Sequence, residues 1–180
     1  ISRKDHFKAL GIQITAKGRT HREIKNKCDV IHSIYPEHRA MFATKGSTPT
    51  QRVVLFLKML EDKAVWSTGI CTLTGADLKA LRRAAQPYLR KLLKEPRLED
   101  EETGHYVHRC NAKLKQIMEQ SKMDPINVMA LRHQHTYAGH LARKIVQDQH
   151  AILRAAVQEG ELAWQNTVSM LNRGNMGHPR

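Results

Sequence analysis

Four short segments carry residues that begin α-helices, and they constrain the fold more than any other feature of the sequence. Three of them start with a threonine that is followed three positions later by Glu, Gln or Asp: Thr20 with Glu23, Thr48 with Gln51, and Thr74 with Asp77. Such side chains satisfy the free amides of a first helical turn. The fourth is Asp124-Pro125, which, like Thr48-Pro49, places proline at the first helical position. The sequence therefore predicts a mostly helical protein.

Apolar residues recur at helical spacing behind these starts. One stripe is Ile24, Cys28, Ile31 and Tyr35, and a second is Leu78, Leu81, Ala85, Tyr88 (or Leu89) and Leu92. Residues 53–66 are apolar on more than one face, which predicts the most buried helix, ending near Gly69. The one convincing β signal is residues 7–19, where Ile12 and Ile14 alternate with polar residues before a turn at Gly18.

The domain organisation follows from these elements and from one change in composition. Residues 95–104 hold five acidic residues and are expected to form an exposed linker. We predict a hairpin over 1–19, a helical bundle over 20–94, a second small helical lobe over 105–173, and a loose tail over 174–180. Within the second lobe, apolar spacing predicts helices from Tyr106 to Met118, after Pro125, and from about Ile145 to Leu171.

The net charge points to the class of partner. Thirty Lys and Arg residues against 17 Asp and Glu give +13, with a pI near 10.0. Such an excess favours a polyanion, nucleic acid before an anionic membrane surface, although a merely solvated basic surface gives the same count. No apolar run approaches the roughly 20 residues that a membrane span requires. Aromatic residues are only 5% of the chain, which favours structured RNA or a duplex over stacked single strands.

The candidate contacts are basic residues on elements whose opposite faces are apolar. A helix of this kind buries one face and presents cations to a sugar-phosphate backbone. Lys27 lies off the first apolar stripe and belongs to this group. The residues predicted to bind nucleic acid are Lys8, Lys17, Arg19, Arg22, Lys25, Lys79, Arg82, Arg83, Lys94, Arg132 and Arg143.

Metal binding and catalysis are not indicated by the motifs. His105-x-x-His108-x-Cys110 and His133-x-His135 offer ligands, but a helical residue two positions further on points away from the shared face. Cys28, Cys71 and Cys110 form no CxxC, which predicts a reduced, intracellular protein without a thiolate zinc site. The chain contains no Walker loop, no nucleophile elbow, no His-Glu-x-x-His and no Asp-Asp. We expect a non-enzymatic protein without a cofactor.

Three segments resemble the region that follows the catalytic palm in reverse transcriptases of non-LTR (LINE-like) retrotransposons. HFKALGIQI (6–14) is similar to the primer grip, matching at Phe7, Lys8, Leu10 and Gly11, with Ala9 in place of tyrosine. GRTHREIKNKC (18–28) resembles the first thumb helix, and residues 64–93 resemble the helix-turn-helix that continues it. LRHQHTYAGHLARK (131–144) matches a C-terminal pattern at Arg132, Gly139, His140 and Arg143, with Tyr137 in place of tryptophan.

The resemblance implies a helical thumb that grips a template–primer duplex by its backbone, and no catalytic residue in this chain. Gly139 would permit close helix packing with Tyr137 and Leu141 inward. His140 would make a structural hydrogen bond or touch phosphate, or simply pack.

The leading hypothesis is a non-catalytic RNA-binding protein derived from such a thumb. We expect it to be a subunit of a large ribonucleoprotein with other proteins, such as an organellar ribosome, in mitochondria or another organelle rather than the nucleus. The alternatives are a fragment of an active reverse transcriptase whose palm lies upstream, and a protein-interaction subunit of a large complex.

Overall fold

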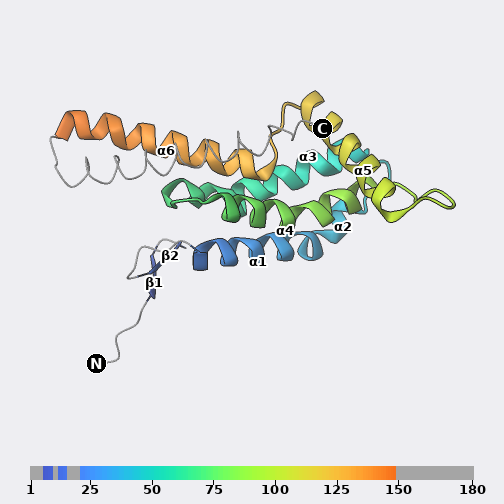
Figure 1. Ribbon diagram of the computed structural model, residues 1–180, viewed down its shortest axis with the longest axis horizontal. Coiled ribbons are helices and arrows are strands. Elements are labelled where there is room, and N and C mark those ends of the chain that lie inside the picture. Colours follow the sequence, from blue (N-terminus) through green and yellow to red (C-terminus); the bar gives the residue numbers. More distant parts are fainter. Residues whose placement is uncertain (1–5, 10–11, 16–20, 149–180) are drawn as a thin grey trace, which may run out of the picture.

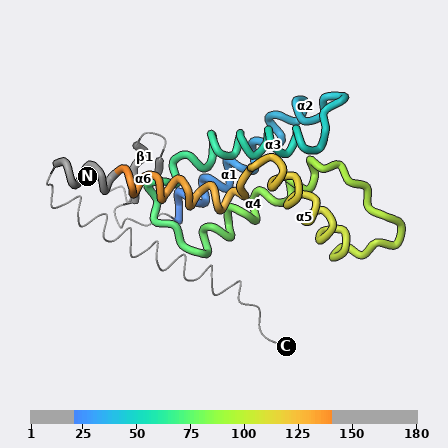
Figure 2. The backbone as a smooth tube through the Cα atoms, turned by 90° about the horizontal axis from the view of Figure 1, so that it is seen from above, coloured from blue at the N-terminus to red at the C-terminus, as the bar shows by residue number. Residues whose placement is uncertain are grey.

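The computed structural model describes the backbone of residues 6–9, 12–15 and 21–148 and the side chains of residues 21–140. The chain is mostly helical, as predicted. In Figure 1, α4 lies between α1 and α6, and α3 packs beside α4. Figure 2 shows α5 at the opposite end of the bundle from the start of α1. The helices are α1 (His21–Glu37), α2 (Arg39–Phe42), α3 (Pro49–Leu60), α4 (Gly75–Leu93), α5 (Thr103–Gln120) and α6 (Ile126–Asp148).

A single cluster of buried apolar side chains holds these helices together. The predicted stripes supply it from α1 and α4. α3 adds Val53, Phe56, Leu57 and Leu60, which are all inaccessible, but α4 buries at least as many apolar residues per turn, so α3 is not the most buried helix as predicted. Residues of α5 and the first half of α6, including Cys110, Leu114 and Met129, belong to the same cluster. The described part of the predicted second lobe thus packs into the same apolar cluster as α1, α3 and α4, while the domain bounds themselves stay a prediction.

The predicted helix starts at Thr48 and Thr74 are confirmed, whereas α6 begins at Ile126, one residue after the predicted start at Pro125. The Gln51 amide donates to Thr48 Oγ1 over 3.2 Å and the Thr48 amide donates to Gln51 Oε1 over 2.9 Å. The same reciprocal pattern joins Thr74 and Asp77 at the start of α4. Thr20 lies outside the described residues. After Asp124-Pro125, α6 continues without interruption to Asp148, so the helices predicted after Pro125 and from Ile145 are joined.

Helical structure continues beyond α3 through a wider, π-helical turn and then a tighter, 3-10 segment. The π-helical turn η1 (Glu61–Val65) follows directly, and the 3-10 segment η2 (Trp66–Ile70) follows η1, so the end predicted at Gly69 is one residue early. η2 packs against α6 at Gly69, where a Cβ atom would lie 3.0 Å from the His133 carbonyl oxygen and 3.2 Å from Tyr137 Cβ. The absence of a side chain at Gly69 thus sets the distance between η2 and α6.

Segments before α1 and after α6 carry several predictions that the described residues do not settle. The backbone of β1 (His6–Ala9) runs antiparallel to β2 (Ile12–Thr15), with Phe7 opposite Ile14. Residues 10–11 and 16–20 are not described, so the hairpin over 1–19 stays a prediction. The part of the predicted C-terminal lobe and tail after residue 148 lies outside the described residues as well.

The acidic segment 95–104 is tied to α5 rather than extended into solvent along its whole length. Arg109 Nη2 lies 2.8 Å from Glu101 Oε2, and its Nη1 lies 3.3 Å from Glu95 Oε2. Lys113 also contacts Glu95, and Arg109 donates to the Pro96 carbonyl oxygen over 2.9 Å. Leu98, Glu99 and Asp100 at the tip remain exposed. The segment is a closed loop held by two cations of the next helix.

All three cysteines of the chain are free. Cys71 and Cys110 are buried, Cys28 is half-buried, and burial raises the pKa of the Cys71 thiol to about 11. Within the described residues, no helix is long and apolar enough to cross a membrane.

The contact at Gly69 predicts a specific cost for an added methyl group. Gly69→Ala should lower the free energy of unfolding by about 1–3 kcal/mol, because the Cβ would force η2 away from α6. Gly104→Ala is the matched control, since a Cβ there meets nothing within 4 Å and alanine favours the first turn of α5. Urea denaturation measures both variants. Equal stability of the two proteins would contradict the close contact.

The loop closed by Arg109 predicts an unusual titration. Hydrogen bonding from Arg109 lowers the pKa of Glu101 to about 2, from an ordinary value of 4.5. Because the folded pKa is depressed, the stabilisation is present above about pH 4.5 and is lost as the pH falls toward 2. Titration of the Glu101 carboxyl carbon by NMR should show this midpoint, and Arg109→Gln should move it up toward 4.5. An unchanged Glu101 midpoint in Arg109→Gln would show that Arg109 does not hold the loop through Glu101.

Candidate nucleic-acid interface

The outer face of α4 carries a concentration of positive charge. Helical spacing places the apolar residues of α4 inward and leaves its cations outward, with Lys79, Arg82 and Arg83 exposed and Arg90 half-buried. The only carboxylate of the helix, Asp77, is buried and accepts hydrogen bonds from the amide and hydroxyl of Thr74. We call the following set the α4 cation face: Lys79, Arg82, Arg83, Arg90, Lys91 and Lys94.

No member of the α4 cation face forms an ion pair with a carboxylate among the described residues. Elsewhere in the described part of the chain, carboxylates neutralise cations: Lys27, Lys58, Lys63, Arg109, Lys113, Lys115 and Arg132 each form an ion pair. Six cations without an ion pair therefore lie along this one helix or at its end. Exposed cations elsewhere in the described residues, such as Lys25, Lys45 and Lys122, likewise form no ion pair, but they are not grouped on one helix.

The basic residues of α1 divide into two kinds. Lys25 and Arg22 are exposed, as predicted. Lys27 is only 3% exposed, and its Nζ lies 3.2 Å from Oε1 of Glu23, which is 1% exposed. The same Nζ lies 5.7 Å from the centre of the Trp66 ring. The expectation that Lys27 presents its charge to a ligand is wrong, because this side of α1 packs against the chain at Trp66.

The 131–144 motif is arranged differently from the expectation. Tyr137 is 39% exposed rather than inward, while its Cβ rests against Gly69. His140 is exposed, which disfavours the packing role. Arg132 is exposed but contacts Asp124, so part of its charge is already neutralised. Gly139 is half-buried, and the glycine that the described contacts show in close approach is Gly69.

Some predicted residues fall where side chains are not described. They are Phe7, Lys8, Leu10, Gly11, Lys17, Arg19, Leu141 and Arg143. Their roles stay predictions.

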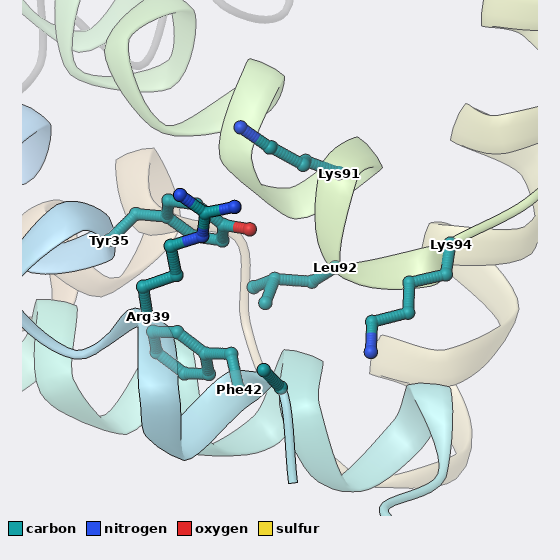
Figure 3. Close-up of a pocket in the computed structure, with 7 residues that line it drawn as sticks. Tyr35, Arg39, Phe42, Lys91, Leu92 and Lys94 are labelled. Carbon is teal, nitrogen blue, oxygen red and sulfur yellow. The ribbon is translucent and has the colours of Figure 1, made fainter. Parts of the chain in front are cut away.

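A shallow pocket at the C-terminal end of α4 was not predicted from the sequence. It has a volume of about 170 Å³ and is lined by Tyr35, Arg39, Phe42, Ala43, Lys91, Leu92 and Lys94. In Figure 3, Arg39 and Tyr35 lie across Leu92 from Lys94. The pocket continues the α4 cation face, because Lys91 and Lys94 belong to both. Arg39 adds a third cation from the four-residue helix α2, which no sequence pattern marked as part of a site.

Aromatic rings form one wall of this pocket, which we call the cationic pocket. Tyr35 stacks on Phe42 with ring centres 5.7 Å apart and on Tyr88 with centres 5.5 Å apart. Lys91 Nζ lies 4.8 Å from the centre of the Tyr35 ring, a distance at which a cation is attracted to the ring. Since these neighbours already occupy the Tyr35 ring, it has a structural role and does not offer a stacking surface.

Arg52 fixes the position of the pocket walls. Its side chain is 6% exposed, and its Nε donates to the Leu92 carbonyl oxygen over 2.8 Å. Nη1 donates to the carbonyl oxygen of Ser47 and to its Oγ, the latter over 3.3 Å. Arg52 thus joins the end of α4 to the segment that leads from α2 to α3. Sequence reasoning missed it, although an arginine beside Val53 in a strongly apolar helix was a signal.

The histidines and cysteines do not assemble into a metal site in the part of the chain that the structure describes. His105 and His108 are exposed whereas Cys110 is inaccessible, and no three His, Cys, Asp or Glu side chains are placed to hold an ion. Comparison of the chain with protein-family models, with curated proteins and with solved structures gave no match.

Removal of the Arg52 guanidinium should destabilise the protein. Arg52→Met keeps most of the stem but leaves the Leu92 and Ser47 carbonyl groups without their donor, and we expect a loss of about 2–3 kcal/mol. Arg83→Met is the control, since Arg83 is exposed and its replacement should change stability by less than about 0.5 kcal/mol. Chemical denaturation compares the two. A loss of the same size in both variants would refute the role given to Arg52.

Proposed function

We propose that this chain is a nucleic-acid-binding protein that acts without catalysis and grips structured RNA or an RNA/DNA duplex by its phosphates. The observation that carries the proposal is the α4 cation face, which no acidic side chain of the described residues neutralises. A helix with its apolar side buried offers such cations at fixed positions, so little ordering is needed when a polyanion binds.

The dimensions of the face suit a row of phosphates. Lys79 and Lys94 stand at its two ends, about 22 Å apart along the helix axis at 1.5 Å per residue. That length spans several consecutive phosphates of a strand. Contacts of this kind position a nucleic acid without reading its bases, so the proposed binding depends on shape and charge rather than sequence.

The origin we propose is the thumb of a non-LTR reverse transcriptase. The ordered similarity of residues 6–14, 18–28, 64–93 and 131–144 supports it, as does the helical character of the described chain. A free-standing thumb of this charge would serve in a large ribonucleoprotein such as an organellar ribosome. The same similarity also supports the second candidate, in which this chain is part of a reverse transcriptase whose palm precedes Ile1.

Charge reversal on α4 tests the proposal. Arg82→Glu together with Arg83→Glu should weaken binding to a short RNA duplex at least tenfold and leave the thermal midpoint nearly unchanged, since both side chains are exposed. Lys115→Glu with Lys122→Glu changes the net charge equally at exposed sites off the face. Fluorescence anisotropy between about 50 and 200 mM salt should show an affinity loss on the order of 10³ for the unaltered protein if about six phosphates are neutralised.

Two outcomes would overturn this function. One is equal loss of affinity in the α4 pair and in the control pair, which would make net charge the cause. The other is RNA affinity that does not change with salt, because phosphate contacts release counterions and must weaken as salt rises.

A further inference from the structure

We propose that the cationic pocket binds the terminal phosphate of a nucleic acid strand whose backbone lies along the α4 cation face. This inference rests on the proposed function and names the part of the ligand that the pocket takes. It concerns a phosphate monoester at a strand end, in contrast to the internal phosphodiesters that the rest of the face contacts.

The lining of the pocket has the charge of an anion site. Three of its seven residues, Arg39, Lys91 and Lys94, are cations, and none is a carboxylate. No ion pair joins any of the three to an acidic side chain among the described residues. An anion in the pocket would reduce the repulsion among them, in addition to the attraction of Lys91 to the Tyr35 ring. A guanidinium provides a planar fork of donors that matches phosphate oxygens, and each ammonium adds three donors.

The size of the pocket limits what can enter it. A volume of about 170 Å³ is below the roughly 300–1,000 Å³ of usual small-molecule sites. Tyr35 cannot accept a base because Phe42, Tyr88 and Lys91 surround its ring. The pocket therefore admits a phosphate group with some water, while the attached nucleotide stays outside.

Two properties favour a terminal phosphate over an internal phosphodiester in this pocket: its larger negative charge and its greater freedom to turn into the pocket. A terminal phosphate carries about −1.5 to −2 near neutral pH, whereas a phosphodiester carries a single negative charge. Three cations stabilise the larger charge more. An end group is also tethered on one side only, so it can turn into a hollow that a continuous backbone would bridge.

The pocket lies at the C-terminal end of α4, where a nucleic acid strand bound along the α4 cation face would end. Lys91 and Lys94 are the last cations of the face, and Lys94 ends α4 in a left-handed conformation with φ of 53°. Arg52 binds the carbonyl oxygen of Leu92, which lines the pocket, and that of Ser47, so this end of α4 is held in place before a ligand arrives.

The experiment compares RNA duplexes that differ only at one strand end. Fluorescence anisotropy at fixed salt would measure affinity for duplexes with a 5′-phosphate, a 3′-phosphate or hydroxyl ends. The unaltered protein should prefer one phosphorylated end at least about fivefold, as expected for an added charge-assisted hydrogen bond. Arg39→Gln should abolish the preference and lower affinity for hydroxyl-ended duplex less than twofold, because Arg39 lies on α2 and not on the α4 cation face.

Two further variants keep the test decisive. Ala43→Glu places a carboxylate at an exposed position of the pocket lining and should also remove the preference, even if Arg39→Gln does not fold. Lys115→Gln removes one exposed charge off the face and should retain the preference. Thermal unfolding with inorganic phosphate, up to about 10 mM, separates a free anion from a strand end.

Each result decides the proposal. Salt-dependent duplex binding with no preference for a phosphorylated end overturns the pocket assignment and leaves the proposed function standing. Stabilisation by inorganic phosphate without that preference shows a free-anion site and also overturns it. Absence of RNA binding of any kind overturns the proposed function first. A preference that survives both Arg39→Gln and Ala43→Glu places the end site elsewhere.

Discussion

The buried guanidinium of Arg52 is the interaction on which the geometry of the interface depends. The last carbonyl groups of a helix lack partners within it and carry the negative end of its dipole, so a cation beside Leu92 stabilises the end of α4. The same group binds Ser47, which precedes the capping box of α3. One side chain therefore joins the end of α4 to the segment that leads into α3. The cationic pocket is the hollow that this arrangement leaves.

The distribution of acidic residues explains how a +13 chain concentrates its charge. Carboxylates in the described residues serve local structural tasks: Asp77 caps α4, Glu95 and Glu101 close the loop before α5, and Glu23 binds Lys27 within the bundle. The cations that pair with these carboxylates contribute less to the positive potential at the surface. The α4 cations take part in none of these tasks, and their potential is what a polyanion would meet.

Local features of the fold could be predicted from the sequence, and contacts between distant segments could not. Caps and stripes depend on residues three or four positions apart, so the starts at Thr48 and Thr74 and the inward residues of α4 were evident. Lys27 was misassigned because its neighbour Trp66 is remote in sequence, and the acidic loop was separated from α5 because composition does not reveal Arg109 as its partner. Arg39 and Lys91 line the same pocket only because α1 and α4 pack together. The likeness to a reverse transcriptase thumb stays a prediction.

The stability of the fold does not depend on a disulfide, because all three cysteine thiols are free. Since Cys28, Cys71 and Cys110 form no disulfide, no covalent bond has to be made or broken when the chain folds. Cohesion of the bundle comes from apolar burial and hydrogen bonds, which glutathione and mild oxidants leave untouched. Cys71, with its raised pKa, holds almost no nucleophilic thiolate near neutral pH. The molecule would therefore keep its shape on transfer between compartments of different redox potential.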